Sequence, residues 1–471
     1  MAEKNVLFLV SVNSEYPVQI TFAKLLREKS SFHPIFGFDS VRHNLYKEIR
    51  DCKNEGFNVV EFTKSFNYRN DKEKSLMTYH QSEDRNKYNR NYWKDISDIL
   101  FIIKPVSKLF KLYSRVIWSF RQFLIKNKII ILIVSNNKFS FNNPYFIKAA
   151  QMEGIQVITL PFGMPTTHTL ATLSEKVGIL NLNRPINKLT SLFFPKWRYQ
   201  KNHFNLFPIP AEFIIVMELL DAAPEQPWSG NGGRANFILT ESNYMKNHYM
   251  KEKINKEKII LTGALYNDVL SRVSKKSKRY YEEFCLKHGL DSNKPMVLTS
   301  FPIYLEKFME NALEFPTYED FVRFYIECML KININYNIVI SIHPRMYPEH
   351  ITGLYNPRII IADERLENIM PLCKFYINSG STTTRWAIAC AKPTINYDFY
   401  RLKSDIFTEK EGVVTVNTTT EFEETLDQMC NNHKYYINLK QKQEKLRPHY
   451  GLLDGNAGER MLNFFESIVI N

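Results

Sequence analysis

The sequence predicts an α/β protein with two domains, each built around a parallel sheet. Short apolar runs rich in β-branched residues alternate with helical patterns along most of the 471 residues. One of these runs, Ile129–Ser135, is apolar at every position but the last, as expected of a strand buried on both faces. The alternation resumes after the polar segment Ser274–Arg279, so the second half of the chain has the same pattern as the first.

The expected elements divide between the two halves of the chain. In the first half, helices are predicted at Val18–Lys29 and Pro144–Glu153, and strands at Val6–Val12, Phe57–Phe62, Ile129–Ser135, Gln156–Leu160, Phe237–Thr240 and Lys258–Thr262. In the second half, a helix is predicted at Tyr318–Ile332, and strands at Pro295–Thr299, Asn337–Ile342, Arg358–Ile361, Phe375–Ile377 and Pro393–Asn396. The predicted domains are residues 1–285 and 286–450, with a terminal helix within 451–471 that packs back on the first domain.

Composition limits the classes of function. The chain is 44% hydrophobic and 14% aromatic, which is enough to bury a core and argues against disorder. A net charge of +13 favours anionic partners, but no zinc-finger or RNP-type motif accompanies it, so a nucleic-acid partner is not expected. The six cysteines are scattered and form no C-x-x-C pair, which suits a reducing compartment and provides no metal framework.

The apolar runs indicate a cytoplasmic protein without a membrane span. Val6–Val10 is too short for the core of a signal peptide, and Ile129–Val134 is far below the roughly 20 residues that cross a bilayer. Two basic, aromatic stretches, 104–128 and 192–204, could still make peripheral contact with an anionic membrane. For 104–128, packing of a helix on the sheet is the simpler interpretation. The stretch 192–204 could instead bind an acceptor.

A turn rich in hydroxyl groups follows the predicted strand Phe375–Ile377. Capping the next helix needs one hydroxyl, yet five occur within six residues, around a single glycine. A helix N-terminus surrounded by extra hydroxyls suits a phosphate group, and a well-capped helix is the alternative. The candidate binding residues are Ser379, Gly380, Ser381, Thr382 and Thr383.

Other polar residues also follow strands, and ligands of open parallel sheets bind beyond the carboxyl ends of the strands. His343 and Arg345 could hold a phosphate, or they could simply belong to a loop stiffened by proline. Ser300 could contact the same group or cap a helix. Glu15 could act as a general base, although exposed loop glutamates are common.

Four segments resemble the GT-B glycosyltransferase superfamily, in particular its capsule, sialyltransferase and Kdo-transferase branch. "ILTESNYMKNHYMKEKINKEKIILTGALYNDVL" (238–270), with Gly263 and Asp268, is similar to the end of the first GT-B domain. "ISIHPR" (340–345) and "LENIMPLCKFYINSGSTTTRWAIACAKPTINYDF" (366–399) resemble the histidine and serine motifs of that branch. "DGNAGERMLNFFESI" (454–468) is similar to the terminal helix of capsule enzymes and CDP-glycerol polyol-phosphate transferases.

The resemblance implies two Rossmann-like domains facing across a cleft, the first binding an acceptor and the second a nucleotide-activated sugar. It implies that His343, Ser379, Ser381 and Thr382 bind the donor phosphate. Many relatives that use UDP-sugars have a glutamate in the helix after the turn, whereas here that helix reads Arg385-Trp386-Ala387-Ile388-Ala389. This departure disfavours the UDP-N-acetylglucosamine epimerases. It favours a CMP-linked ulosonic acid, such as sialic acid or Kdo, whose carboxylate would suit Arg345.

The resulting expectation is a glycosyltransferase of bacterial surface-polysaccharide synthesis, with a glycan or glycolipid acceptor and no cofactor or metal. His343 would stabilise the leaving phosphate, and Glu15 would deprotonate the acceptor. A polyol-phosphate transferase, a UDP- or GDP-sugar glycosyltransferase, and a basic scaffold without enzymatic activity are the alternatives.

Overall fold

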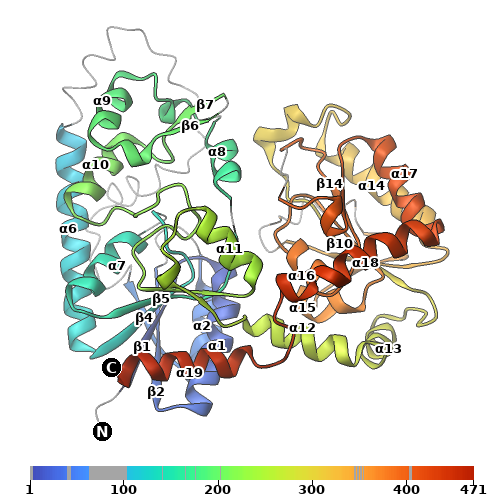
Figure 1. Ribbon diagram of the computed structural model, residues 1–471, viewed down its shortest axis with the longest axis horizontal. Helices are drawn as coiled ribbons and strands as arrows, with labels where there is room; N and C mark the ends of the chain where they lie inside the picture. The colour runs from blue at the N-terminus through green and yellow to red at the C-terminus, as the bar shows by residue number, and fades with distance from the viewer. Residues whose placement is uncertain are drawn as a thin grey trace. The chain divides into compact units, whose positions relative to one another are not determined.

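The computed structural model folds the chain into two compact units (Figure 1). The structure describes residues 4–39, 44–62, 103–139, 142–164, 166–175, 177–201, 203–343, 355–402 and 406–470, together with Met346, His350 and Gly353. Unit 1 draws its described residues from 1–240, 245–262 and 462–471, and unit 2 from 241–244 and 263–461.

Unit 1 contains a seven-stranded parallel sheet with the strand order β3-β2-β1-β4-β5-β8-β9. The strands are β1 (Lys4–Val10), β2 (Phe32–Phe38), β3 (Asn58–Glu61), β4 (Ile129–Val134), β5 (Gln156–Thr159), β8 (Phe237–Thr240) and β9 (Ile259–Leu261). All of their pairings are parallel, which confirms the predicted class of sheet.

Side chains that alternate along β1 give the sheet two apolar faces. Leu7 and Leu9 belong to a core shared with α6 (Ile103–Lys126), α7 (Asn143–Met152) and α10 (Ala211–Leu219). On the other face, the ring of Phe8 stacks on Phe36 and meets Phe22 of α1 (Tyr16–Lys29) edge to face. The remaining helices and hairpin of this unit are α2 (Tyr46–Asn54), α8 (Thr167–Glu175), α9 (Pro185–Phe193), α11 (Asn243–Lys251), β6 (Tyr199–Lys201) and β7 (Phe204–Leu206).

One face of helix α6 packs in the core of unit 1, as the simpler interpretation of 104–128 expects. The side chains that it buries in the core of unit 1 are Leu109, Leu112, Tyr113, Val116, Ile117, Phe120 and Leu124. Most of the regularly spaced apolar residues of 104–128 are therefore used for packing against the sheet and its neighbouring helices. Within the described part of the chain, no helix combines the length and the apolar character that crossing a bilayer requires.

Unit 2 contains a six-stranded sheet with the order β12-β11-β10-β13-β14-β15, again with only parallel pairs. The strands are β10 (Met296–Ser300), β11 (Asn337–Ser341), β12 (Ile359–Ala362), β13 (Phe375–Asn378), β14 (Thr394–Tyr397) and β15 (Val413–Val416). The helices are α12 (Leu265–Lys275), α13 (Ser277–His288), α14 (Tyr318–Ile332), α15 (Leu366–Ile369), α16 (Thr384–Ala389), α17 (Thr419–Asn431) and α18 (His433–Tyr450).

The core of unit 2 shows where the chain passes into it. Leu270 of α12 and Phe284 of α13 are buried beside Met296 and Leu298 of β10. Both helices therefore belong to unit 2, although α12 and most of α13 lie within the range 1–285 that the sequence assigns to the first domain.

The last helix, α19 (Ala457–Ile470), starts in unit 2 and ends in unit 1. The carboxylate of Asp268 accepts hydrogen bonds from the backbone N–H groups of Ala457 and Gly458, each at 2.9 Å, and so caps the helix. Near its other end, the ring of Phe465 packs edge to face on Phe22 and Phe32 of unit 1.

Candidate active site

The strand order of unit 2 defines one place where a ligand is expected. The chain runs outward from β10 through β11 to β12, and then crosses back to β13 and continues outward on the other side. In open parallel sheets, ligands bind at such a reversal, beyond the carboxyl ends of the two central strands. Ser300 is the last residue of β10 and Asn378 the last of β13, so Ser300 and the hydroxyl-rich turn flank the reversal.

Two asparagines shape the hydroxyl-rich turn. The side-chain oxygen of Asn378 accepts a hydrogen bond from the backbone N–H of Ser381 at 3.1 Å, and that of Asn396 accepts one from Gly380 at 2.7 Å. Gly380 has φ +64°, a conformation that residues with a Cβ adopt only with strain. Neither asparagine was among the candidate binding residues: in the sequence, Asn378 follows the predicted strand Phe375–Ile377 and Asn396 ends the predicted strand Pro393–Asn396.

A chain of hydroxyl groups joins the turn to β10. Tyr376 donates a hydrogen bond to Ser300 Oγ at 2.5 Å, and its hydroxyl lies 2.8 Å from Thr383 Oγ1. Thr383 Oγ1 lies 2.7 Å from Ser381 Oγ. Burial raises the pKa of Tyr376 to about 12, so its hydroxyl remains a hydrogen-bond donor at neutral pH. Three of the predicted site residues, Ser300, Ser381 and Thr383, are thus brought together by a tyrosine that the sequence did not single out.

Two hydroxyls of the turn remain available to a ligand. Within the described chain, the hydroxyls of Ser379 and Thr382 and the backbone N–H of Thr382 have no hydrogen-bond partner, and both residues are only half-buried. Helix α16 has six residues, so few aligned peptide dipoles stand behind these groups. The anion-binding capacity of the turn therefore depends on individual hydrogen-bond donors more than on the helix.

His343 follows β11, the strand next to β10 in the sheet. It is half-buried, and its backbone oxygen accepts a hydrogen bond of 2.9 Å from the N–H of Met346. This position is beyond the same edge of the sheet as Ser300 and the turn. Arg345 lies outside the described residues.

A buried ion pair fixes the helix that follows the turn. Arg385 and Glu241 are almost fully buried, and the Arg385 Nε–H donates to Glu241 Oε1. Tyr266 donates to the other carboxylate oxygen, and the Asn267 side chain donates to the Glu241 backbone oxygen at 3.0 Å. Burial, followed by the nearby Glu241 carboxylate, raises the pKa of Tyr266 well above its usual value.

The sheet of unit 1 also reverses its strand order, between β1 and β4. Glu15 follows β1, and its carboxylate oxygen Oε2 accepts hydrogen bonds from the backbone N–H groups of Ser11 and Val12, at 2.9 and 3.3 Å. The other oxygen, Oε1, is buried and has no hydrogen-bond partner in the described chain. Glu15 is therefore not the exposed loop glutamate that was the alternative interpretation of this position: its side chain is 1% exposed.

The environment of Glu15 gives its carboxyl group a neutral-range pKa. Burial raises the pKa to about 7, although the two backbone hydrogen bonds oppose the shift, and the nearby Asp39 carboxylate adds to it. A carboxyl group with this pKa can exchange a proton near neutral pH, which is the property that a general base needs. An ordering role for the loop after β1 is compatible with the same contacts.

One group of residues has the composition of a metal site. His288, Asp363 and Glu364 bring three possible ligand atoms within 4.8 Å of one another. The ammonium group of Lys287 donates to both carboxylates, at 2.9 and 2.6 Å, and so already neutralises part of their charge. This arrangement suits an ion-pair cluster better than a cation site.

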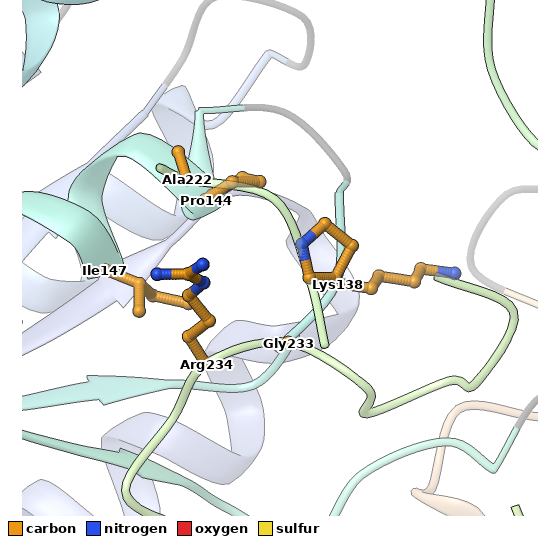
Figure 2. Close-up of a pocket in the computed structure, with 7 residues that line it drawn as sticks. Lys138, Pro144, Ile147, Ala222, Gly233 and Arg234 are labelled. Atoms are coloured by element: carbon orange, nitrogen blue, oxygen red, sulfur yellow. The ribbon is translucent and has the colours of Figure 1, made fainter. Parts of the chain in front are cut away.

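A small hollow lies on unit 1, and none of the predicted site residues lines it. Its lining residues are Lys138, Pro144, Ile147, Ala222, Pro224, Gly233 and Arg234 (Figure 2). Arg234 pairs with Asp221 at 2.6 Å and donates to the Ala223 backbone oxygen. Its positive charge is therefore already neutralised within the protein. With a cavity volume of only about 10 Å³, the hollow is far smaller than the roughly 300 Å³ at which ligand sites begin.

Comparison with solved structures identifies the fold. Over 99% of its length, the chain superposes on 97% of the MnaA–UDP structure of S. aureus, with a TM-score of 0.50 and 12% identity. The calicheamicin glycosyltransferase CalG4 matches with a TM-score of 0.52 and 10% identity, covering 100% of this chain and 99% of CalG4. The wall teichoic acid polymerase TagF matches with a TM-score of 0.52 and 11% identity, covering 98% and 88% of the two chains.

These likenesses, together with the two parallel sheets, show that the chain has the GT-B fold. No protein-family model matches the sequence. No curated protein sequence matches it either. The activity of the chain therefore has to be argued from the residues of the site.

The Glu241–Arg385 pair predicts a large, non-additive effect on stability. Arg385→Leu alone leaves the Glu241 carboxylate buried without its partner, which should lower the free energy of unfolding by about 3–5 kcal/mol. The double variant Glu241→Leu/Arg385→Leu should recover a large part of that loss, because no unpaired charge remains buried. Denaturant unfolding of the wild type, both single variants and the double variant measures the coupling. Additive losses would contradict this account of the pair.

Proposed function

We propose that the chain is a glycosyltransferase that uses a nucleotide-activated sugar. The observation that carries this proposal is the turn at the strand reversal of unit 2, where Ser379 and Thr382 present unpaired hydroxyls beside Ser300. A phosphate group accepts several hydrogen bonds at once, and such a turn offers several donors in a small space. The MnaA structure with UDP has the same fold, which supports a nucleotide as the ligand.

In this proposal, the predicted donor site divides into groups that build it and groups that contact the ligand. Ser379, Thr382 and His343 would bind the donor phosphate directly. Ser300, Ser381 and Thr383 would take part through the hydroxyl chain that runs through Tyr376, and Gly380 would give the turn its shape. Arg345 would bind an acidic group of the sugar. Charge develops on the phosphate as the glycosidic bond breaks, so donors that are already in place lower the barrier.

Unit 1 would supply the acceptor site and the base. Glu15 has one carboxylate oxygen held by two backbone N–H groups and a second without a partner. That second oxygen would take the proton of the acceptor hydroxyl. The acceptor would be a glycan or glycolipid of a bacterial surface polysaccharide, and the enzyme would work in the cytoplasm.

A CMP-linked ulosonic acid is the favoured donor. Helix α16 carries no acidic residue, and its second residue, Arg385, is paired with Glu241. This composition removes the carboxylate that many UDP-sugar enzymes of this fold use to hold a ribose. The missing carboxylate also argues against a UDP-N-acetylglucosamine 2-epimerase activity for this chain. UDP- and GDP-sugars remain donors to be tested.

A polyol-phosphate transferase is the second candidate, because TagF has the same fold with a TM-score of 0.52. That reaction moves a phosphorus-containing unit to the acceptor, whereas a glycosyltransferase moves a sugar alone. Mass spectrometry of the acceptor product separates the two activities, since only the polyol-phosphate product gains phosphorus.

His343→Ala should reduce turnover of the nucleotide donor by roughly 10²-fold, the scale of losing one donor to a developing oxyanion. The measurement is release of nucleotide from the donor under saturating conditions. His350→Ala provides a matched control, because this half-buried histidine packs against Tyr304 and Tyr318, outside the predicted site residues. Near-normal turnover of His343→Ala would remove His343 from the mechanism.

Glu15→Gln should lower kcat by about 10²–10⁴-fold, because glutamine can accept the same backbone hydrogen bonds but cannot take a proton. In the wild type, kcat/KM should rise with pH and level off above about 7, since the carboxylate that acts as base forms as pH passes through the Glu15 pKa. This rise should be absent from the residual activity of the variant. A variant that keeps the wild-type pH profile would assign Glu15 an ordering role in the loop after β1.

A further inference from the structure

Helix α9 (Pro185–Phe193) buries polar side chains and exposes apolar ones, which is the reverse of an ordinary surface helix. Its buried side chains are the polar Asn187, Thr190 and Ser191. Its exposed side chains are the basic Lys188 and the apolar Leu189, Leu192 and Phe193, and the three apolar ones are 40%, 74% and 71% exposed. In a soluble protein, a surface helix normally places its apolar side chains against the core and its polar side chains in water. Figure 1 shows α9 at the periphery of unit 1, next to α10.

The inverted orientation is held in place by specific contacts. The Asn187 side chain donates to the backbone oxygens of Ile179 and Asn181, at 2.9 and 2.8 Å. Ser191 donates to the backbone oxygen of Lys188 at 2.7 Å. The Thr190 hydroxyl is buried without a hydrogen-bond partner in the described chain, which is itself unfavourable. The protein therefore maintains an arrangement that, in water alone, loses free energy on both faces of the helix.

The chain around α9 is rich in basic residues, which indicates that the exposed apolar side chains of α9 face an anionic partner. From Val177 to Ala211 the chain contains no Asp or Glu, and its basic residues are Arg184, Lys188, Lys196, Arg198 and Lys201. Lys196 pairs with Glu218 at 3.1 Å, and Glu175 reaches His203 at the same distance. Lys188 and Lys201 are exposed, and the described chain offers neither of them an ion-pair partner.

We propose that α9 is a membrane-docking helix that inserts Leu189, Leu192 and Phe193 into the interface of an anionic bilayer. The interfacial region accepts apolar side chains from a helix lying in its plane, and anionic headgroups attract the flanking lysines. An apolar surface of another protein would satisfy the same three side chains, but it would not explain a flank of 35 residues free of acidic side chains. The bilayer accounts for both features.

This inference deepens the proposed function, since a glycolipid acceptor would lie in the same membrane, but it stands on α9 and its flank. If the protein binds vesicles but no nucleotide, the membrane-docking proposal still holds and the proposed function fails. If it binds a nucleotide but no vesicles, the proposed function still holds and the membrane-docking proposal fails. The two proposals can therefore fail separately.

The test is co-sedimentation of the full chain with vesicles of phosphatidylcholine containing about 30% phosphatidylglycerol, compared with pure phosphatidylcholine. The wild type should bind the anionic vesicles and should be released by salt. Leu192→Ser/Phe193→Ser should lower the partition coefficient about tenfold or more, because each side chain loses apolar burial. Lys188→Gln and Lys201→Gln should each lower it about fivefold on anionic vesicles only.

Leu286→Ser is the matched control, because Leu286 is 86% exposed on α13 of unit 2. This variant should bind vesicles like the wild type. The proposal is overturned if the wild type does not sediment with anionic vesicles, or if the Leu192/Phe193 variant binds as well as the wild type. It is also overturned if that variant instead converts a wild-type dimer to a monomer, because a second copy of the chain would then be the occupant of α9.

Discussion

Both sheets reverse their strand order once, and the positions of the candidate site residues follow from these two reversals. In unit 2 the reversal separates β10 from β13, and in unit 1 it separates β1 from β4. At such a point the two central connections leave the sheet in opposite directions, so the carboxyl ends of the strands remain open to a ligand. Ser300 is the last residue of the central strand β10, the Ser379–Thr383 turn follows β13, and Glu15 follows β1.

The turn shows how a protein can have many hydroxyls at a site without using them all in the same way. Ser381 and Thr383 are connected to each other and, through Tyr376, to Ser300. The hydroxyls of Ser379 and Thr382 have no hydrogen-bond partner in the described chain. Hydroxyls that hydrogen-bond one another are satisfied within the protein, whereas those without a protein partner remain ready to exchange water for phosphate. The Glu241–Arg385 pair then holds the helix that starts directly after the turn.

The sequence predicted the fold class and the place of the turn, because both depend on local patterns. Its failures have physical causes. Strand β2 (Phe32–Phe38) was missed because Pro34 and Gly37 interrupt it. Both are tolerated in the folded chain, and Gly37 leaves room for Phe62, whose ring atom would lie 2.3 Å from an added Cβ.

Interactions between distant residues could not be predicted. Glu241 and Arg385 are 144 positions apart, and no local pattern links them. The burial of Glu15, and with it the raised pKa, depends on packing around the loop after β1. The inverted face of α9 was hidden for a similar reason. The sequence shows the aromatic and basic residues of 192–204, but the fold decides which of these side chains are exposed.

The central claim is that the turn of unit 2 binds the phosphate of a nucleotide, and thermal stabilisation tests it most directly. CMP, CDP, UDP and GDP would each be added to the wild type and to Ser379→Ala/Thr382→Val. A nucleotide at about 100 times its Kd should add roughly 2.7 kcal/mol of stability to the wild type. The variant should keep its own stability but lose most of this gain, because hydrogen bonds to a charged phosphate are worth about 1.5–3 kcal/mol each. Stabilisation by CMP would favour the acidic-sugar donor, and stabilisation by CDP the polyol-phosphate reaction. If no nucleotide stabilises the wild type, or if the variant responds equally, the turn is only a well-capped start of α16.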